Sequence, residues 1–340
     1  MMRVLLFGVV LLTAVIRAQT SETTALVVGQ GLREPFAVDF DAAGRMFIAE
    51  QAGHRVSIFH GGVLTVLAGA GEVGLPEADA TGAAAHFNGP HHLLVGPDRR
   101  LYVADTFNNS VRRVDPVSGR VTRFAGTGEK GFSGDGGPAA EARLSGAFAI
   151  DIRNGTLYIA DLGNRRIRAV DMASGIIRTV AGNGARGVPE DGAAATAAPL
   201  VDPRAVAVDE ARRIYICERA GHALRVVEAD GRIRTVAGTG QPGFGGDGGP
   251  ALRAAMNGPK HISIDADGSV LITDTENHAI RRYVPSTGTL VRVAGTGEKG
   301  ASGLGGPPTS LQLNRPHGAF RHRGALYIAD SDNHRIVVVR

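Results

Sequence analysis

A short segment recurs six times along the 340-residue chain, and this repeat limits the fold more than any other feature. An acidic residue marks each copy, and consecutive acids lie 55 to 57 residues apart. The copies are IAEQAGHRV ending at Val56, VADTFNNSV at Val111, IADLGNRRI at Ile167, ICERAGHAL at Leu224, ITDTENHAI at Ile280 and IADSDNHRI at Ile336. Such a period is typical of chains that stack one supersecondary unit against the next.

Each unit has the pattern of four short strands. In the unit that starts at Pro90 these are residues 91–95, 101–105, 110–114 and 121–126. All are rich in β-branched and aliphatic side chains and are bounded by Gly, Pro, Asn or Asp. Helical periodicity is confined to short pieces such as 138–144 and 251–256. Six such units predict an all-β fold, a six-bladed β-propeller of four-stranded blades.

The two ends of the chain complement each other. Only four residues follow Ile336, so the sixth unit lacks its outermost strand. Residues 25–31, ALVVGQG, align with the fourth strands of the other five units. We therefore expect the N-terminal strand to close the last blade beside residues 334–338, burying Leu26, Val27 and Val28 and pairing an otherwise open edge.

The first 18 residues have the pattern of a secretory signal peptide. Arg3 is followed by an apolar run over residues 4–16 and by a cleavage position after Ala18. The apolar run is too short to span a bilayer. This pattern predicts a signal peptide at 1–18 and a propeller over 19–340, secreted or periplasmic and not inserted in a membrane.

The composition argues against several classes of partner and site. The formal net charge is +4 and falls to about +2 without the two arginines of residues 1–18, which argues against a nucleic-acid partner. The chain has no Trp and only 5% aromatic residues, so it lacks a dense stacking platform for single-stranded nucleic acid. Its only cysteine, Cys217, excludes an internal disulfide and a cysteine-based zinc site.

Residues that recur once per unit are interpreted as structural. The repeated acid is expected to accept hydrogen bonds from the N–H groups of its own turn. Three positions later stands Asn in four units and Gly in two, which predicts a left-handed backbone at that position. A G-x-G-x-x-G pattern follows the outermost strand five times and opens no βαβ unit, so it does not predict a dinucleotide site. Its copies start at Gly69, Gly126, Gly182, Gly238 and Gly295.

The starts of the inner strands break the repeat. In a propeller these starts converge at one mouth of the central channel, where the repeat predicts small apolar residues. The third unit lacks the opening Pro and has Gly146-Ala147-Phe148 there. Because Arg and Lys stay charged at neutral pH, the pattern favours a site for an anionic ligand. The predicted ligand-binding residues are His91, His92, Arg204, Lys260, His261 and His317.

The units resemble NHL repeats, in which a P-x-x-V-x-V-D strand precedes Y-V-A-D-x-x-N-x-R-I. The resemblance covers residues 24–340, and the loops GTGEKGFSGDGGPA and GTGQPGFGGDGGPA are similar to those of bacterial exported members. It implies a six-bladed propeller. Because this family includes scaffolds, receptors, RNA-binding proteins, lyases and lactonases, function has to be argued from the site.

The pattern favours a monomeric, non-catalytic scaffold that binds a protein or a small anionic ligand and needs no cofactor. The alternative is an enzyme, either a zinc-dependent lyase similar to the peptidylglycine lyases or a gluconolactonase-like hydrolase. In the lyase, His91 or His92, His261 and His317 would hold the metal. The lactonase would use an acid such as Glu34. Calcium at Asp135 or Asp247 is a weaker expectation, since each loop offers one carboxylate.

Overall fold

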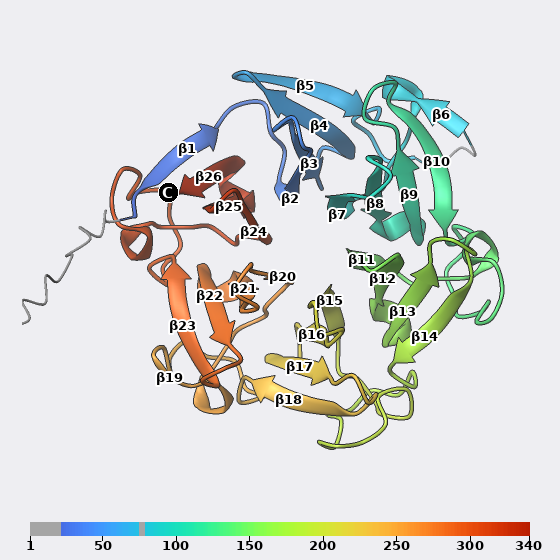
Figure 1. Ribbon diagram of the computed structural model, residues 1–340. Helices are drawn as coiled ribbons and strands as arrows, with labels where there is room; N and C mark the ends of the chain where they lie inside the picture. The colour runs from blue at the N-terminus through green and yellow to red at the C-terminus, as the bar shows by residue number, and fades with distance from the viewer. Residues whose placement is uncertain (1–21, 75–78) are drawn as a thin grey trace, which may run out of the picture.

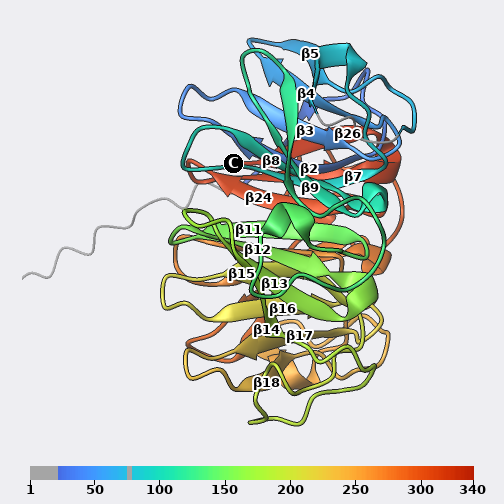
Figure 2. The same ribbon diagram turned by 90° about the vertical axis from the view of Figure 1, so that its right-hand side faces the viewer.

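Six antiparallel sheets form a ring around a central axis in the computed structural model of the protein, which describes residues 22–74 and 79–340. Figures 1 and 2 show this ring down its axis and from its side. The six-bladed propeller is therefore confirmed, with four strands in each blade and a short extra strand on two of them. The expected signal peptide, residues 1–18, lies outside the described residues.

The strands follow the predicted order, from the channel outwards. Blade 1 contains β2 (Pro35–Phe40), β3 (Met46–Glu50), β4 (Arg55–His60) and β5 (Val63–Ala68). Blade 2 contains β7 (Pro90–Val95), β8 (Leu101–Asp105), β9 (Ser110–Val114) and β10 (Arg120–Ala125), with β6 (Asp79–Thr81) outside them. Blade 3 contains β11 (Ala147–Arg153), β12 (Thr156–Asp161), β13 (Arg166–Asp171) and β14 (Ile177–Ala181).

The second half of the ring repeats this arrangement. Blade 4 contains β15 (Pro203–Val208), β16 (Ile214–Glu218), β17 (Ala223–Val227) and β18 (Ile233–Ala237). Blade 5 contains β20 (His261–Ile264), β21 (Val270–Asp274), β22 (Ala279–Val284) and β23 (Thr289–Ala294), with β19 (Gly249–Pro250) outside them. Blade 6 contains β24 (Gly318–His322), β25 (Ala325–Asp330), β26 (Arg335–Val339) and β1 (Thr24–Val28).

The helical patterns become single 3₁₀ turns, and the described residues contain no α-helix. The segments expected to be helical hold only η3 (Ala139–Glu141) and η5 (Ala251–Arg253). The other turns are η1 (Gly82–Ala84), η2 (Thr106–Asn108), η4 (Leu162–Asn164), η6 (Thr275–Asn277), η7 (Pro308–Ser310) and η8 (Ser331–Asn333). Short apolar repeats in the loops therefore pack as turns between blades.

The N-terminal strand closes the ring, as predicted. β1 pairs antiparallel with β26, from Thr24 opposite Val339 to Val28 opposite Ile336. The expected burial of β1 is only partly correct. Val28 is buried and Val27 half-buried, but Leu26 is 50% exposed.

The repeated acid is structural, as predicted, but its partners differ from those expected. In blade 2, Asp105 Oδ1 accepts a hydrogen bond from the N–H of Asn88, and Oδ2 accepts one from Asn108 Nδ2. Asn88 lies in the loop that enters the blade, so the acid holds that loop, and its own turn contributes the Asn108 side chain but no backbone N–H group. A buried arginine of the third strand faces the acid in four blades, at Arg112, Arg168, Arg225 and Arg281.

The glycine-rich loops supply a second carboxylate to two of these arginines. Asp135 Oδ1 lies 2.7 Å from Arg168 Nη2, and Asp247 Oδ1 lies 2.8 Å from Arg281 Nη2. In blade 6, Val337 stands at the position of these arginines, and the equivalent loop carries Leu304 in place of the aspartate. Both aspartates are thus ion-paired to the protein itself.

The left-handed residue lies one position later than predicted. Asn108 is helical, and the positive φ of 48° belongs to Asn109. In the other blades the same position is His54, Arg165, His222, His278 or His334. Several of these side chains hold the next blade. His54 Nδ1, for example, accepts the N–H of Gly89 at 3.1 Å, and His278 Nδ1 accepts the N–H of Arg315 at 3.0 Å.

Candidate ligand-binding site in the central channel

A β-bulge at the start of the inner strands directs two consecutive side chains toward the channel. In blade 2, Pro90 pairs with Asp105 but His92 pairs with Ala104, so two residues of β7 oppose one residue of β8. The same shift occurs in blades 1, 3 and 4. A bulge of this kind re-aims side chains at the end of a strand. It turns the predicted single ring of residues into two layers.

The outer layer contains one residue from each blade and is here called the mouth ring. Aromatic contacts join its members: the His317 and Phe36 rings stack with centroids 3.8 Å apart, and His91 packs edge-on against Phe36 and Phe148. In blade 3 the channel residue is Phe148, because Ala147 takes the position that Pro has in other blades. The mouth ring consists of Phe36, His91, Phe148, Arg204, Lys260 and His317.

The second layer is narrow. Four of its positions carry the small residues Ala37, Ala149, Ala205 and Gly318, and the other two carry His92 and His261. His92 is in blade 2 and His261 in the opposite blade 5, yet their Nε2 atoms lie 2.8 Å apart. This histidine pair therefore reaches across the channel. Four of the six predicted site residues lie in the mouth ring, and the remaining two lie in the layer beneath it.

All four channel histidines are held neutral. Burial, followed by the charge of Arg204, lowers the pKa of His92 to about 4 and of His91 well below its ordinary value. Burial also lowers the pKa of His261 and His317 well below the ordinary value. The four imidazoles are therefore uncharged at pH 7.

The tautomers of the mouth histidines follow from their neighbours. His91 Nδ1 lies 2.7 Å from the Gly89 carbonyl oxygen, and His317 Nδ1 lies 2.9 Å from that of Arg315. A carbonyl only accepts, so both Nδ1 atoms carry the proton and both Nε2 atoms are left as acceptors. Neither Nε2 atom has a hydrogen-bond partner among the described residues. The mouth ring thus presents two unused acceptors.

Arg204 is the exceptional member of the mouth ring. Its side chain is 5% exposed, and its guanidinium carbon lies 4.4 Å from the centre of the Phe148 ring. Within residues 22–74 and 79–340 it makes no hydrogen bond or ion pair, because nearby Asp202 is bonded to Arg219. Burial, together with repulsion from Arg219, lowers the pKa of Arg204 to about 9. It remains charged at pH 7, and buried charges are normally paired.

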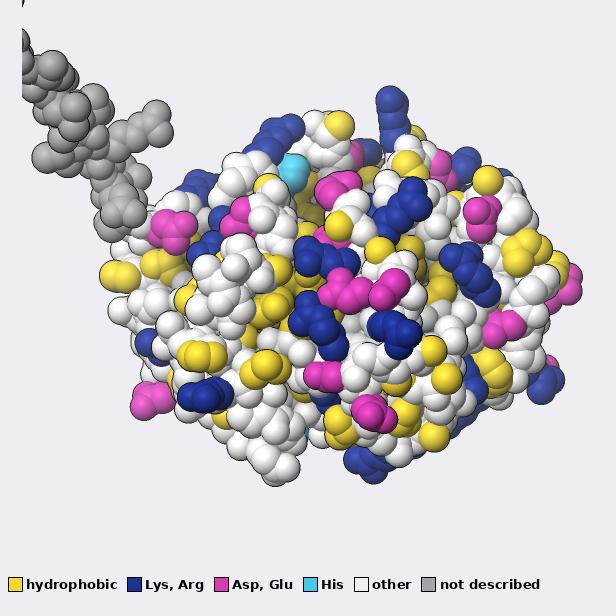
Figure 3. Space-filling view, turned by 60° about the horizontal axis from the view of Figure 1, so that its bottom comes forward, with side chains coloured by type: hydrophobic (Ala, Val, Ile, Leu, Met, Phe, Trp, Pro, Cys, Tyr) yellow, Lys and Arg dark blue, Asp and Glu magenta, His cyan; other side chains and the backbone are white. Residues whose placement is uncertain are grey.

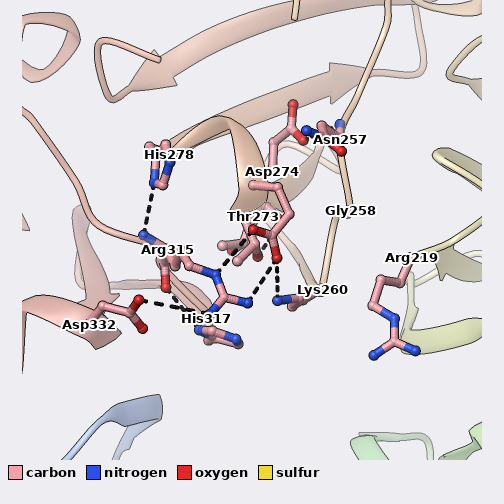
Figure 4. Close-up of polar contacts among 12 residues, drawn as sticks. Arg219, Asn257, Gly258, Lys260, Thr273, Asp274, His278, Arg315, His317 and Asp332 are labelled. Atoms are coloured by element: carbon pink, nitrogen blue, oxygen red, sulfur yellow. Dashed lines mark hydrogen bonds and ion pairs between the residues drawn. The ribbon is translucent and has the colours of Figure 1, made fainter. Parts of the chain in front are cut away.

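Lys260, by contrast, is part of an ion-pair network. Its Nζ lies 2.7 Å from Glu276 Oε1, and the same carboxylate accepts two hydrogen bonds from Arg315. Figure 4 shows Lys260, Arg315 and His317 side by side, with Arg219 apart from them on another blade. Burial lowers the pKa of Lys260 to about 8, although Glu276 acts in the opposite direction. Glu276 therefore offsets part of the positive charge of Lys260 and Arg315.

The histidines do not form the zinc site that the lyase hypothesis requires. His92 and His261 bond to each other, while His91 and His317 lie in the other layer and direct Nδ1 to backbone carbonyls. No three His, Cys, Asp or Glu side chains of the described residues are grouped to hold a metal ion. A catalytic zinc usually has three protein ligands, so the residues present do not fit that group. Cys217 is buried, as predicted, and burial raises its pKa.

Sequence reasoning missed a cavity on the other side of the histidine pair. It has a volume of about 620 Å³, and its walls include His92, His261, Asp39, Asp151 and Phe320. Asp39, Asp151 and Phe320 lie two positions beyond the second layer on their strands, as Asp39 follows Ala37. Strand alternation could have identified them, but only after the bulge had fixed which residues face inward.

A second hollow, of about 570 Å³, lies between blades 4 and 5 and is lined by paired charges such as Arg213 with Asp209 and Arg321 with Asp265. Basic and acidic side chains are interspersed over the face seen in Figure 3. Across the described residues, no helix has the length and hydropathy needed to cross a membrane.

Comparison with known proteins identifies relatives for most of the chain. It is 30% identical to SUPPRESSOR OF QUENCHING 1 of Arabidopsis thaliana over 278 residues, which covers 77% of this chain and 26% of that protein. It is 26% identical to NHL repeat-containing protein 2 of Gallus gallus, covering 90% of this chain and 46% of the relative. The chain thus spans less than half the length of these relatives. No protein-family model matches the sequence.

Solved structures share the fold at low identity. An auxiliary nutrient binding protein from Bacteroides ovatus superposes with a TM-score of 0.67 at 15% identity, covering 95% of this chain and 77% of that one. Virginiamycin B lyase from Staphylococcus aureus gives a TM-score of 0.56 at 14% identity, covering 94% and 98%. At such identities the likeness concerns the propeller alone.

Proposed function

The chain belongs to the NHL-repeat β-propeller family, and we propose that it is an exported binding module that takes a small anionic ligand at the mouth ring. Catalysis has no part in this proposal. One observation carries it: Arg204 is a charged side chain, 95% removed from solvent, without a counter-ion among the described residues. An anion at this mouth would supply the missing partner, and guanidinium groups recognise carboxylates and phosphates by paired hydrogen bonds.

The neighbours of Arg204 define the ligand further. The Nε2 atoms of His91 and His317 accept but do not donate, so they give the anionic group itself no hydrogen bond and would bind a hydroxyl or ammonium group of the same ligand. Phe36 and Phe148 offer apolar faces beside them. The site therefore suits a small carboxylate or phosphate that also carries hydrogen-bond donors, such as a hydroxy acid.

A binding role has a precedent among the proteins that share this fold. The Bacteroides ovatus protein is an auxiliary nutrient binding protein, and its propeller is similar to this one over 95% of the chain. The lyase alternative would need a metal, and the channel histidines do not group as ligands for one. We infer that the propeller presents a preformed site on a rigid ring, which lowers the entropic cost of binding.

The test is a calorimetric titration of the protein with lactate, glycerate and inorganic phosphate at pH 7. Removing the guanidinium by Arg204→Met should weaken binding of the preferred anion at least tenfold, since a charged hydrogen-bonded contact is lost. The variant should melt no lower than the wild-type protein, because an unpaired buried charge is removed. Arg178→Met, which removes an exposed arginine of β14, is the matched control and should bind normally.

Two results would reject the proposal. One is that none of these anions binds at millimolar concentration. The other is that Arg204→Met and Arg178→Met bind them equally well. A metal that is retained by the wild-type protein and lost only from His261→Ala would instead restore the lyase hypothesis.

A further inference from the structure

The cavity beneath the histidine pair is a second chamber of the channel with a different chemical character. Its innermost wall consists of the third inward position of each inner strand, namely Asp39, Leu94, Asp151, Ala207, Ser263 and Phe320. His92 and His261 form its floor, so the side chains of this pair separate it from the mouth ring. With a volume of about 620 Å³, it falls within the usual range for small-molecule sites, roughly 300–1,000 Å³.

Two carboxylates on the wall lack a cationic hydrogen-bond partner. Asp39 accepts hydrogen bonds only from the backbone N–H groups of Phe40 and Val95, at 2.7 Å each. Asp151 accepts only from Ile152 and Val208, at 2.9 and 2.7 Å. None of these bonds involves a cation, and each carboxylate oxygen keeps a second lone pair.

The charges around the chamber favour a cation. Arg153 also lines the wall, but its guanidinium is bonded to Glu210 and to the Val208 carbonyl. Burial raises the pKa of Asp39 and Asp151 to about 6, so both are ionised at pH 7.5. Because the floor histidines are neutral, the chamber has a net negative charge, which is opposite in sign to the charge of Arg204.

We propose that this chamber binds a small organic ammonium ion with an apolar body. The ammonium group would lie between Asp39 of blade 1 and Asp151 of blade 3. Leu94, Ala207 and Phe320 would surround the apolar part, and an aromatic ring also attracts a cation. A bare divalent ion is a poorer match, because it prefers six to eight oxygen ligands and much of this wall is apolar.

The decisive variant places a cation in the chamber without removing a hydrogen bond. Leu94 lies on blade 2, between the two aspartates, and it makes no polar contact through its side chain. Leu94→Lys would supply an internal ammonium group, and Leu94→Met is the matched control of similar size. Asp39→Asn is a poorer test, because the amide NH₂ would face one of the two backbone N–H groups that the carboxylate accepts, and that hydrogen bond would be lost.

The experiment is calorimetric titration with benzylamine, benzyl alcohol and benzoate at pH 7.5. Benzylamine should bind, and the alcohol and the acid should bind at least tenfold more weakly. Leu94→Lys should weaken benzylamine binding at least tenfold more than Leu94→Met, which changes the shape of the wall but not its charge. The proposal fails if benzyl alcohol binds as tightly as benzylamine, if Leu94→Lys binds normally, or if calcium binds and benzylamine does not. Arg204→Met should change the affinity for benzylamine by less than twofold. The proposal for this chamber and the proposal for the anion site can therefore be rejected independently.

Discussion

At the scale of single residues, the repeat fills the space beside its acidic side chain in two different ways. Four blades have Asp with Asn three residues later, and two have Glu with Gly, at Glu50 and Gly53 and at Glu218 and Gly221. The Asn amide donates to the shorter Asp, as Asn108 does to Asp105. A Cβ added at Gly221 would lie 3.0 Å from Glu218 Oε2, so the carboxylate of the longer acid occupies the space of the Asn side chain.

This alternation predicts the result of a double-mutant cycle. Gly221→Asn should lower the free energy of unfolding by about 1–3 kcal/mol, as overpacking does. Adding Glu218→Asp should recover most of the loss, because the shorter acid then accepts from the new Asn. Urea denaturation measures both changes, with Gly245→Asn as control, because a Cβ there meets no atom within 4 Å and the backbone φ is not positive. If the double variant is less stable than Gly221→Asn, the proposed exchange of side chains is wrong.

The pH dependence of anion binding follows from the two cations of the mouth ring. Burial lowers the pKa of Arg204 to about 9 and of Lys260 to about 8. Each loses its charge as pH rises through its pKa, so anion affinity should be constant below about pH 7 and fall progressively between pH 7 and 10. Titrations of a permanently charged sulfonate over this range measure the effect. An affinity that rises with pH would contradict a role for these cations.

At the scale of elements, the pattern predicts the strands well and the bulges poorly. The predicted strands 101–105 and 110–114 match β8 and β9, because residues that favour turns stand at both ends of each strand. The bulge depends on pairing between neighbouring strands, which no single strand specifies. For this reason the mouth residues were predicted as one ring although they form two layers. The chamber walled by Asp39 and Asp151 was missed for the same reason.

The closing strand gives a prediction at this scale. Deleting residues 1–30 removes β1, its ladder with β26 and the burial of Val28 and part of Val27, worth about 2–4 kcal/mol in apolar contacts alone. The shortened chain should melt with lower cooperativity or associate through the exposed edge of β26. A chain that starts at Glu22 is the control. Thermal melts that agree within two degrees would contradict closure by β1.

At the scale of the whole molecule, the channel separates charge along its axis. The mouth ring holds the unpaired Arg204, the chamber at the other side holds Asp39 and Asp151, and the His92–His261 pair lies between them. The six blades, their order and their closure could be predicted from the repeat. This charge separation could not, because it depends on which residues of each strand face inward after folding.

The central claim is that Arg204 binds an anion at the mouth ring. Anomalous X-ray scattering from crystals grown in bromide tests it most directly, because the ion is located without assuming a ligand. We predict an anomalous peak in contact with the Arg204 guanidinium, beside the Phe148 ring, that is absent from Arg204→Met crystals. Arg204 turned into an ion pair with Asp202, with no peak at the mouth ring, would contradict the claim.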